Sequence, residues 1–183
     1  MMKIETERLI LRDLKKTDIK DLHKNVNDKQ IAKSIPVIKY PYIRKYAVDF
    51  VNSCIKESGK KQRAKYEFCI CLKSDNKLIG MIGISKVDRF HGTCTIGYWI
   101  GKDYRRQGIM SEALDRVIKF VFKTLKLRRI DITALGDNTA SNELIKKKGF
   151  IYEGTRKECV RDWATKRLHD RIDYGILKKN WIK

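Results

Sequence analysis

Proline is scarce in this sequence, and so are acidic side chains relative to basic ones. Among 183 residues only 2 are proline and 22 are Asp or Glu, whereas 42 are Lys or Arg, so the formal net charge is +20. With so few prolines and a hydrophobic content of 42%, the composition is that of a folded chain rather than a disordered one. At this length we expect one domain that spans residues 1–183 around a single core.

Long apolar runs are missing as well. No stretch approaches the roughly 20 apolar residues that a membrane helix needs, and charged residues interrupt the chain from Lys3 onward, which argues against a secretory leader. The 5 cysteines are odd in number and show no CxxC spacing, and with 3 scattered histidines they give no reason to expect a metal site. We therefore expect a cytoplasmic protein with reduced thiols, without a metal and without a membrane partner.

The excess of basic residues has two interpretations. It can reflect a polyanionic partner such as the ribosome or RNA. It can equally belong to solvated surface lysines, because the basic residues are spread over the chain in groups such as Lys60–Lys61 and Lys146–Lys148, and no run is long enough to be a nucleic-acid tail. The sequence leaves both interpretations open, and it gives no indication of oligomeric state.

Two common phosphate-binding motifs are absent, since there is no GxxxxGK[ST] loop and no GxGxxG after a strand. Residues 96–110 are instead typical of a buried strand, a short basic loop and the start of a long helix. The helix is indicated by apolar residues at spacings of three and four, namely Ile109, Met110, Ala113, Leu114, Val117, Ile118, Val121, Phe122 and Leu125.

The start of this helix is a candidate anion site. The first turn of a helix leaves its amides without acceptors, at the positive end of the helix dipole. Gly108 lets a ligand approach the backbone closely, and Arg105 and Arg106 add positive charge. We expect four amides to face such a ligand, those of Gln107, Gly108, Ile109 and Met110.

The remaining periodicity predicts a mixed α/β (α+β) fold. Strands are expected at residues 4–14, 66–72, 78–87, 93–100, 130–135, 150–161 and 167–177. Helices are expected after Thr17, over residues 43–55 with a stop at Gly59, over residues 107–126, and from Asn138 to a stop at Gly149. The sheet should be antiparallel at first and parallel where the long helix joins two strands.

Several motifs resemble the GNAT superfamily of N-acetyltransferases. Arg105-x-x-Gly108-x-Met110 is similar to the (Q/R)xxGx(G/A) motif with which that superfamily binds the pyrophosphate of acetyl-CoA. Its RimJ/RimL-like branch, which acetylates the N-termini of ribosomal proteins, is similar in four further stretches: Thr6-Glu7-Arg8-Leu9-Ile10-Leu11-Arg12, Asn138-x-x-Ser141 followed by Lys148-Gly149-Phe150, Glu153-Gly154, and His169-Asp170-Arg171 through Trp181. This chain departs from the pattern at Met110, where Gly or Ala is usual, and at Thr95, where many members have Glu.

The resemblance implies a mostly antiparallel central sheet, flanked by helices, whose strands 93–100 and 130–135 splay apart around the thioester. It also implies acetyl-CoA as co-substrate, held by the loop 105–110, by the strand end at Trp99 and Ile100, and by Asn138 and Ser141. At the strand end, the resemblance implies that a backbone N–H polarises the thioester carbonyl. Ser141 is the candidate acid for the leaving thiolate, although a helix-capping serine would look the same in sequence. Residues 146–148 are expected to form a solvated face, although one of these lysines could approach the adenosine phosphate of the cofactor.

Acetyl transfer requires a neutral amine. An α-amino group with a pKa of about 7.7–8.0 is roughly one tenth neutral at pH 7, whereas a lysine near 10.4 is neutral at well under about one part in a thousand. No histidine lies in the site segments, and the best remaining base is Glu67, acting through water, unless this residue is a structural glutamate. The lack of a strong base favours a protein N-terminal α-amine, with a ribosomal protein as one candidate, attacking directly in a ternary complex.

Two alternatives stay open. The same chemistry could serve a small amine such as an antibiotic, a polyamine or an amino acid, or the chain could be a non-catalytic module that binds CoA or RNA. The three loops expected to shape an acceptor pocket, residues 34–46, 87–93 and 161–169, carry no recognisable code for the acceptor.

Overall fold

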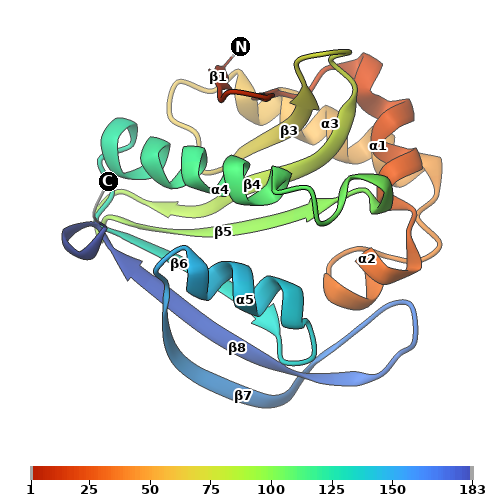
Figure 1. Ribbon diagram of the computed structural model, residues 1–183. Coiled ribbons are helices and arrows are strands. Elements are labelled where there is room, and N and C mark those ends of the chain that lie inside the picture. Colours follow the sequence, from red (N-terminus) through yellow and green to blue (C-terminus); the bar gives the residue numbers. More distant parts are fainter. Residues whose placement is uncertain (1, 182–183) are drawn as a thin grey trace.

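The computed structural model describes residues 2–181, which form an eight-stranded sheet (Figure 1). Across the sheet, the strands are β1 (Lys3–Glu5), β2 (Leu9–Asp13), β3 (Tyr66–Leu72), β4 (Leu78–Asp88), β5 (Thr93–Ile100), β6 (Arg129–Leu135), β8 (Leu168–Leu177) and β7 (Ile151–Arg161). Neighbouring strands among these residues are antiparallel except β5 and β6, which are parallel. This arrangement confirms the predicted mixed sheet.

Helices cover both faces of the sheet (Figure 1). α4 (Ile109–Lys119), its π-helical continuation η3 (Phe120–Thr124) and α5 (Thr139–Lys147) lie on one face, whereas α1 (Ile19–Val26) and α3 (Arg44–Ser58) lie on the other, with α2 (Lys29–Ser34) beside them. Short 3-10 turns are η1 (Lys16–Asp18), η2 (Lys102–Tyr104) and η4 (Lys178–Asn180). In residues 2–181 no helix combines the length and the apolar character needed to cross a bilayer.

The alternation of side chains along β3 divides the core into two parts. Phe68 and Ile70 belong to the large cluster beneath α4, whereas Cys69 and Cys71 pack against α1 and α3. Each residue of the central strands can therefore be assigned to the α4–α5 face or to the α1–α3 face.

The parallel pairing of β5 with β6 stops before either strand ends. It runs from Thr93 opposite Arg129 to Ile96 opposite Ile132. Beyond that point β5 continues with β4 and β6 continues with β8. The sheet therefore opens between residues 97–100 and 133–135. We call this opening the wedge, and it is the splay that the resemblance implies.

Three elements differ from the expectation. The strand expected over residues 4–14 is a hairpin of β1 and β2, because the Thr6 amide donates to Leu9 O at 3.0 Å and closes a turn. α2 falls in a stretch with no expected helix, and the Asp28 side chain caps it by accepting from the Gln30 amide at 2.7 Å. The long helix begins at Ile109 rather than at residue 107, and its α-helical part ends at residue 119 where the π turn begins.

Candidate active site

The loop before α4 forms a cradle of unused backbone amides. Gly108, the N-cap residue, has a φ of +75°, and Arg106 is also left-handed at +61°. The first helical bond of α4 runs from the Glu112 amide to Gly108 O at 3.0 Å. The four amides predicted from the sequence, those of Gln107, Gly108, Ile109 and Met110, donate no hydrogen bond to any acceptor within residues 2–181. Successive amides of this kind at a helix N-terminus suit a phosphate group.

The two arginines of the loop have different roles. Arg106 is exposed and forms no ion pair with any described residue. The Arg105 guanidinium instead donates to the Asp28 carboxylate at 2.5 Å, and its Nε lies 3.4 Å from Ile100 O. Arg105 therefore fixes the loop to α2 and to the end of β5, and Arg106 is the charge left for a ligand.

Met110, the departure from the family motif, does not obstruct the cradle. Its side chain is 9% exposed and belongs to the main core, as does that of Ile109. Both residues therefore turn their side chains inward and leave only their amides at the front of the helix.

Arg8, which was not predicted as a site residue from the sequence, also reaches the cradle. Its guanidinium donates to Gln107 O at 3.1 Å, and one nitrogen lies 3.5 Å from the position that a Cβ on Gly108 would take. Glu112 holds it there by accepting from the Arg8 amide at 3.0 Å and from its Nε at 2.7 Å. Burial alone would raise the pKa of Glu112, but hydrogen bonds from Thr6 and Arg8 keep it below its usual value. A separation of 99 positions between Arg8 and Gln107 hides this contact in the sequence.

The edge of β5 presents backbone groups to the wedge. The Gly101 amide donates to Ile79 O at 2.9 Å. Because alternate residues of an antiparallel pair turn their backbone groups to the partner strand, Trp99 faces β4 in the same way, whereas Tyr98 and Ile100 face the wedge. Of the two residues predicted to contact the cofactor by backbone, the geometry thus brings Ile100 to the opening. The Trp99 side chain packs on the α1–α3 face.

Ser141 lies across the wedge from β5 and is paired with Tyr98. The two hydroxyl oxygens are 2.9 Å apart, and Asn138 Oδ1 accepts from the Ser141 amide at 3.2 Å as the N-cap of α5. Burial raises the pKa of Tyr98 to about 12, with the Ser141 hydrogen bond acting in the opposite direction. The phenol therefore stays protonated at neutral pH and can donate to Ser141, whose own proton is then available to a group in the wedge. Tyr98 was not predicted as a site residue from the sequence.

The expectation of a solvated face at residues 146–148 is wrong for Lys148. Its side chain is 8% exposed, and its ammonium lies 2.6 Å from the Asp115 carboxylate on α4. Lys146 and Lys147 are exposed, as expected. The Lys148 ion pair joins α5 to α4, so that the helices on either side of the wedge are held together.

Glu67 lies on the opposite face of the sheet, at the end of a row of glycines. It stands opposite Gly83 on β4, and Gly83 stands opposite Gly97 on β5. The carboxylate leans over Gly83, where an added Cβ would lie 2.4 Å from Oε2. Above Gly97 no described atom lies within 4 Å of the corresponding position. Because neighbouring strands are about 4.8 Å apart, roughly one strand spacing of open space separates the carboxylate from the wedge.

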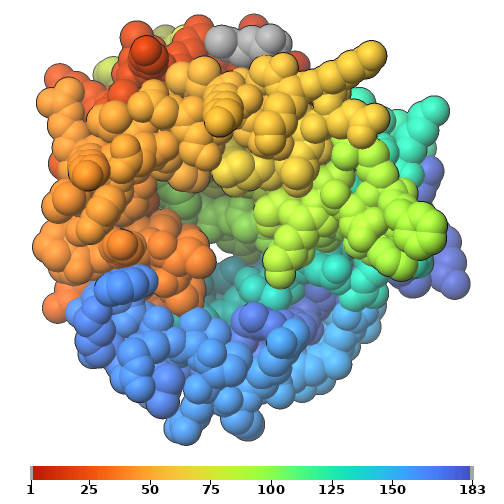
Figure 2. Space-filling model, turned by 180° about the vertical axis from the view of Figure 1, so that it is seen from behind, coloured from red at the N-terminus to blue at the C-terminus, as the bar shows by residue number. Residues whose placement is uncertain are grey.

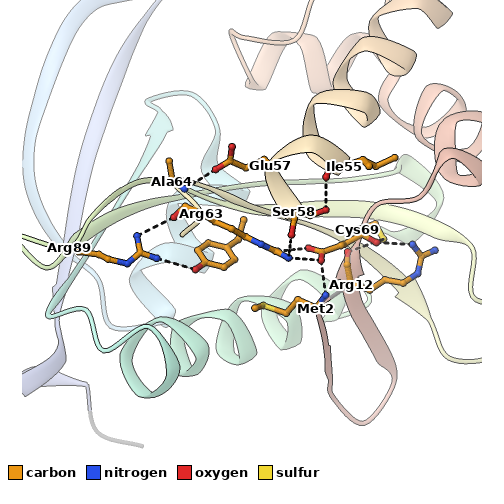
Figure 3. Close-up of polar contacts among 11 residues, drawn as sticks. Met2, Arg12, Ile55, Glu57, Ser58, Arg63, Ala64, Cys69 and Arg89 are labelled. Carbon is orange, nitrogen blue, oxygen red and sulfur yellow. Dashed lines mark hydrogen bonds and ion pairs between the residues drawn. The ribbon is translucent and has the colours of Figure 1, made fainter. Parts of the chain in front are cut away.

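Glu67 is a largely buried carboxylate beside a small cavity. Burial raises the pKa of Glu67 to about 7, and the charge of Lys65 only partly opposes this shift. Arg63 lines the same small cavity. Its guanidinium donates to the Asp13 carboxylate at 2.7 and 2.9 Å and to Ser58 O at 2.7 Å, so it is not directed at Glu67. Figure 3 shows these contacts and their neighbours around Arg63. A carboxylate that is half-protonated near neutral pH is matched to proton transfer.

Figure 2 shows that the molecule is hollowed on the side away from α4 and α5. The hollow is bordered by the orange segment around α2, the yellow-green turn between β4 and β5, and the blue hairpin of β7 and β8, with green and teal strand segments at its base. Lys39 Nζ lies 5.0 Å from the centre of the Tyr46 ring and 5.7 Å from that of Trp163, so the orange and blue borders meet. We call this feature, bordered by residues 34–46, 87–93 and 161–169, the rear hollow.

Comparison with known proteins finds this architecture elsewhere. Residues 8–151 match the family described as acetyltransferase (GNAT) domain. The uncharacterized N-acetyltransferase YnaD of Bacillus subtilis (strain 168) is 29% identical over 183 residues, which cover 98% of this chain and 99% of YnaD. The ribosomal-protein-serine acetyltransferase of Escherichia coli (strain K12) is 35% identical over 98 residues, or 54% of each chain. With YdaF of Bacillus subtilis the match spans 57% of that protein, at 32% identity over 107 residues and 58% of this chain.

Solved structures share the fold over nearly the whole chain. RimL, a ribosomal L7/L12 α-N-protein acetyltransferase in complex with coenzyme A, superposes with a TM-score of 0.85 at 22% identity, covering 96% of this chain and 98% of RimL. Spermidine N-acetyltransferase from Vibrio cholerae, in complex with CoA and spermine, superposes with a TM-score of 0.82 at 20% identity, covering 97% of this chain and all of the other. At these identities the likeness concerns the fold.

Proposed function

Because this chain belongs to the family of GNAT acetyltransferase domains, it is an acetyl-CoA-dependent N-acetyltransferase, and we propose that its acceptor is the N-terminal α-amine of a protein. Relatives named for ribosomal proteins make a ribosomal protein one candidate. The reaction we propose is direct attack of the amine in a ternary complex.

The observation that carries the proposal is the pKa of Glu67, which burial raises to about 7. An α-ammonium group with a pKa of about 7.7–8.0 can pass its proton to such a carboxylate at a cost of about 1 kcal/mol. A lysine ammonium near 10.4 would cost about 5 kcal/mol at about 1.36 kcal/mol per unit. A base with this pKa would deprotonate an α-amine at a much smaller cost than a lysine-like amine.

The residues divide the reaction between the two faces of the sheet. When bound, acetyl-CoA supplies an activated acetyl thioester, and the cradle before α4 would hold its diphosphate. The Tyr98 and Ile100 amides line the wedge, where a donor stabilises charge that develops on a carbonyl oxygen. Glu67 takes a proton from the amine through water above Gly97. As the N–C bond forms and the C–S bond breaks, Ser141 donates a proton to the thiolate; solvent restores both groups.

A second candidate acceptor is a small amine, because spermidine N-acetyltransferase has the same fold. The primary amines of a polyamine resemble that of lysine, so the cost of deprotonation by Glu67 argues against them.

A competition between amines tests the proposal. One peptide with a single lysine is prepared with its N-terminus either free or blocked, and spermidine is the third acceptor. Thiol release from acetyl-CoA gives kcat/KM, and mass spectrometry locates the acetyl group. We expect the free N-terminus to exceed the blocked peptide and spermidine by about tenfold or more at pH 7, as the difference in amine basicity requires. Equal rates on the lysine or on spermidine would contradict the proposal.

A further inference from the structure

We propose that the rear hollow selects protein N-termini whose first residues beyond the reactive amine are acidic and apolar. This inference rests on the proposed function and narrows its substrate class. It is carried by the side chains of the three segments that border the rear hollow.

Exposed apolar side chains occur in all three of these segments. Eight large hydrophobic residues are exposed among the described residues, and six of them belong to the three segments: Val37, Tyr40, Ile43, Phe90, Trp163 and Leu168. Phe90 is 92% exposed and Val37 is 85% exposed. Single exposed apolar residues are ordinary, but several in adjoining segments are typical of an interaction site. Residues 34–46 and 161–169 adjoin, since Lys39 Nζ lies 5.7 Å from the centre of the Trp163 ring, so an extended chain lying in the hollow could contact both.

The charge of the border has one sign. Residues 34–46, 87–93 and 161–169 contain seven basic residues and two acidic ones. All seven are exposed, and none forms an ion pair with another described residue. Lys166 lies 4.1 Å from the centre of the Trp163 ring, beside Lys39 at 5.7 Å.

Both acidic residues are already engaged. Asp162 is 1% exposed, with His169 Nε2 at 2.9 Å from its carboxylate. Asp88 accepts from the His91 amide at 2.8 Å. The border therefore offers cations next to aromatic rings and little negative charge in return.

This arrangement discriminates between acceptors by charge. A polyamine carries several positive charges and is repelled, whereas an acidic peptide is attracted and its apolar side chains meet the exposed rings. Clefts of one sign can raise association rates by about 10- to 1000-fold. A cationic border also favours the neutral form of a nearby amine, which is the form that attacks.

A charge series of peptides tests the inference. The peptides share their first three residues, contain no lysine and carry three Glu, three Gln or three Arg at positions 4–6. We expect kcat/KM to fall from Glu to Gln to Arg by about tenfold or more overall at low salt, and the difference to shrink as salt increases. The double substitution K39E/K166E should weaken or reverse the order. K119E/K123E, an equal change of charge at two exposed lysines on α4 and η3, should leave the order intact, with thermal unfolding confirming that each variant folds.

The outcomes separate the inference from the proposed function. Equal kcat/KM for the three peptides would overturn the inference and leave acetylation of N-terminal α-amines in place. Failure to acetylate any of them would overturn both. A single-stranded RNA could instead compete with the peptides and lose its affinity in K39E/K166E, while the charge of the peptide has no effect on kcat/KM. That result would assign the border to nucleic acid and overturn the inference.

Discussion

Replacing Glu67 by Gln should make the protein more stable and less active at the same time. The pKa of Glu67 is raised from 4.5 to about 7 in the folded protein, so between these pH values the folded state holds a proton that the unfolded state has released. Stability therefore falls as pH rises through this window, and the loss is complete above about pH 7. A shift of about 2.5 units corresponds to about 3 kcal/mol. Gln carries no charge and avoids this cost.

The gain in stability should depend on pH in a defined way. At pH 8 the Glu67→Gln variant should be up to about 3 kcal/mol more stable, which for a domain of this size is a rise in Tm of about 6–12 °C. Below about pH 4, where Glu67 is protonated in the folded state and mostly protonated in the unfolded state, the two proteins should melt at nearly the same temperature. Thermal and denaturant unfolding at pH 5 and pH 8 measure this difference. Glu7→Gln, at an exposed position, is the matched control and should show little effect.

Activity should change in the opposite direction. Loss of a general base typically costs about 10²- to 10⁴-fold, and we expect about 100-fold in kcat/KM at pH 7 because an α-amine is already partly neutral. At pH 9 solution itself deprotonates the amine, so the loss should become smaller. A rise in Tm that is the same at pH 5 and pH 8 would refute the buried-carboxylate argument. An activity loss that is the same at pH 7 and pH 9 would refute the role as base.

Four further substitutions test the remaining parts of the site. Ser141→Ala and Tyr98→Phe should each lower kcat by about tenfold or more, while the KM for acetyl-CoA stays within about twofold. The double variant should have a kcat no lower than that of Ser141→Ala. Multiplicative losses in kcat would show that the two hydroxyls act separately. Gly97→Ala should raise the KM for the acceptor, because the added methyl group fills the open space above this residue. The Tm of the variant should stay equal or rise, because Gly weakens a strand by about 0.5–1 kcal/mol. An unchanged KM would exclude a route for the acceptor amine above Gly97. Gly108→Ala forces a side chain into a left-handed conformation at a cost of about 1–2 kcal/mol and should weaken coenzyme A binding by about tenfold in calorimetry; an unchanged Kd would count against the cradle.

The parts of this fold that were predictable from sequence depend on local periodicity. β3 and β5 have the predicted bounds, because a run of alternating or apolar residues between turn signals defines a strand by itself. α2 has six residues and too little periodicity to be recognised. The turn at Thr6 divides β1 from β2, and it depends on the hydrogen bond from the Leu9 amide to the Thr6 hydroxyl. The pattern of apolar residues in the sequence does not indicate such a bond.

The site was predictable where its parts lie close together in the chain. The cradle before α4 is a single loop, so its four amides could be named from the sequence. The Tyr98–Ser141 pair joins positions 43 apart, and the open row beside Glu67 exists only because Gly83 and Gly97 fall opposite it in two successive strand pairings. Elimination identified Glu67 as the best carboxylate, but the environment that raises its pKa follows from the register of the sheet.

The period of two along β5 explains how one strand would serve both ends of the proposed reaction. Gly97 and Tyr98 are consecutive, so the space above Gly97 opens on the α1–α3 face while the Tyr98 side chain points to the α4–α5 face. The proposed base, Glu67, therefore lies on one side of the sheet, and the hydroxyl pair proposed to serve the leaving group lies on the other, where the two cannot neutralise each other directly. The edge of β5 in the wedge is accessible from both sides because β6 no longer pairs with it there. A shift of one residue in the β4–β5 register would exchange the two faces, so the chemistry depends on this pairing as directly as on any side chain in the site.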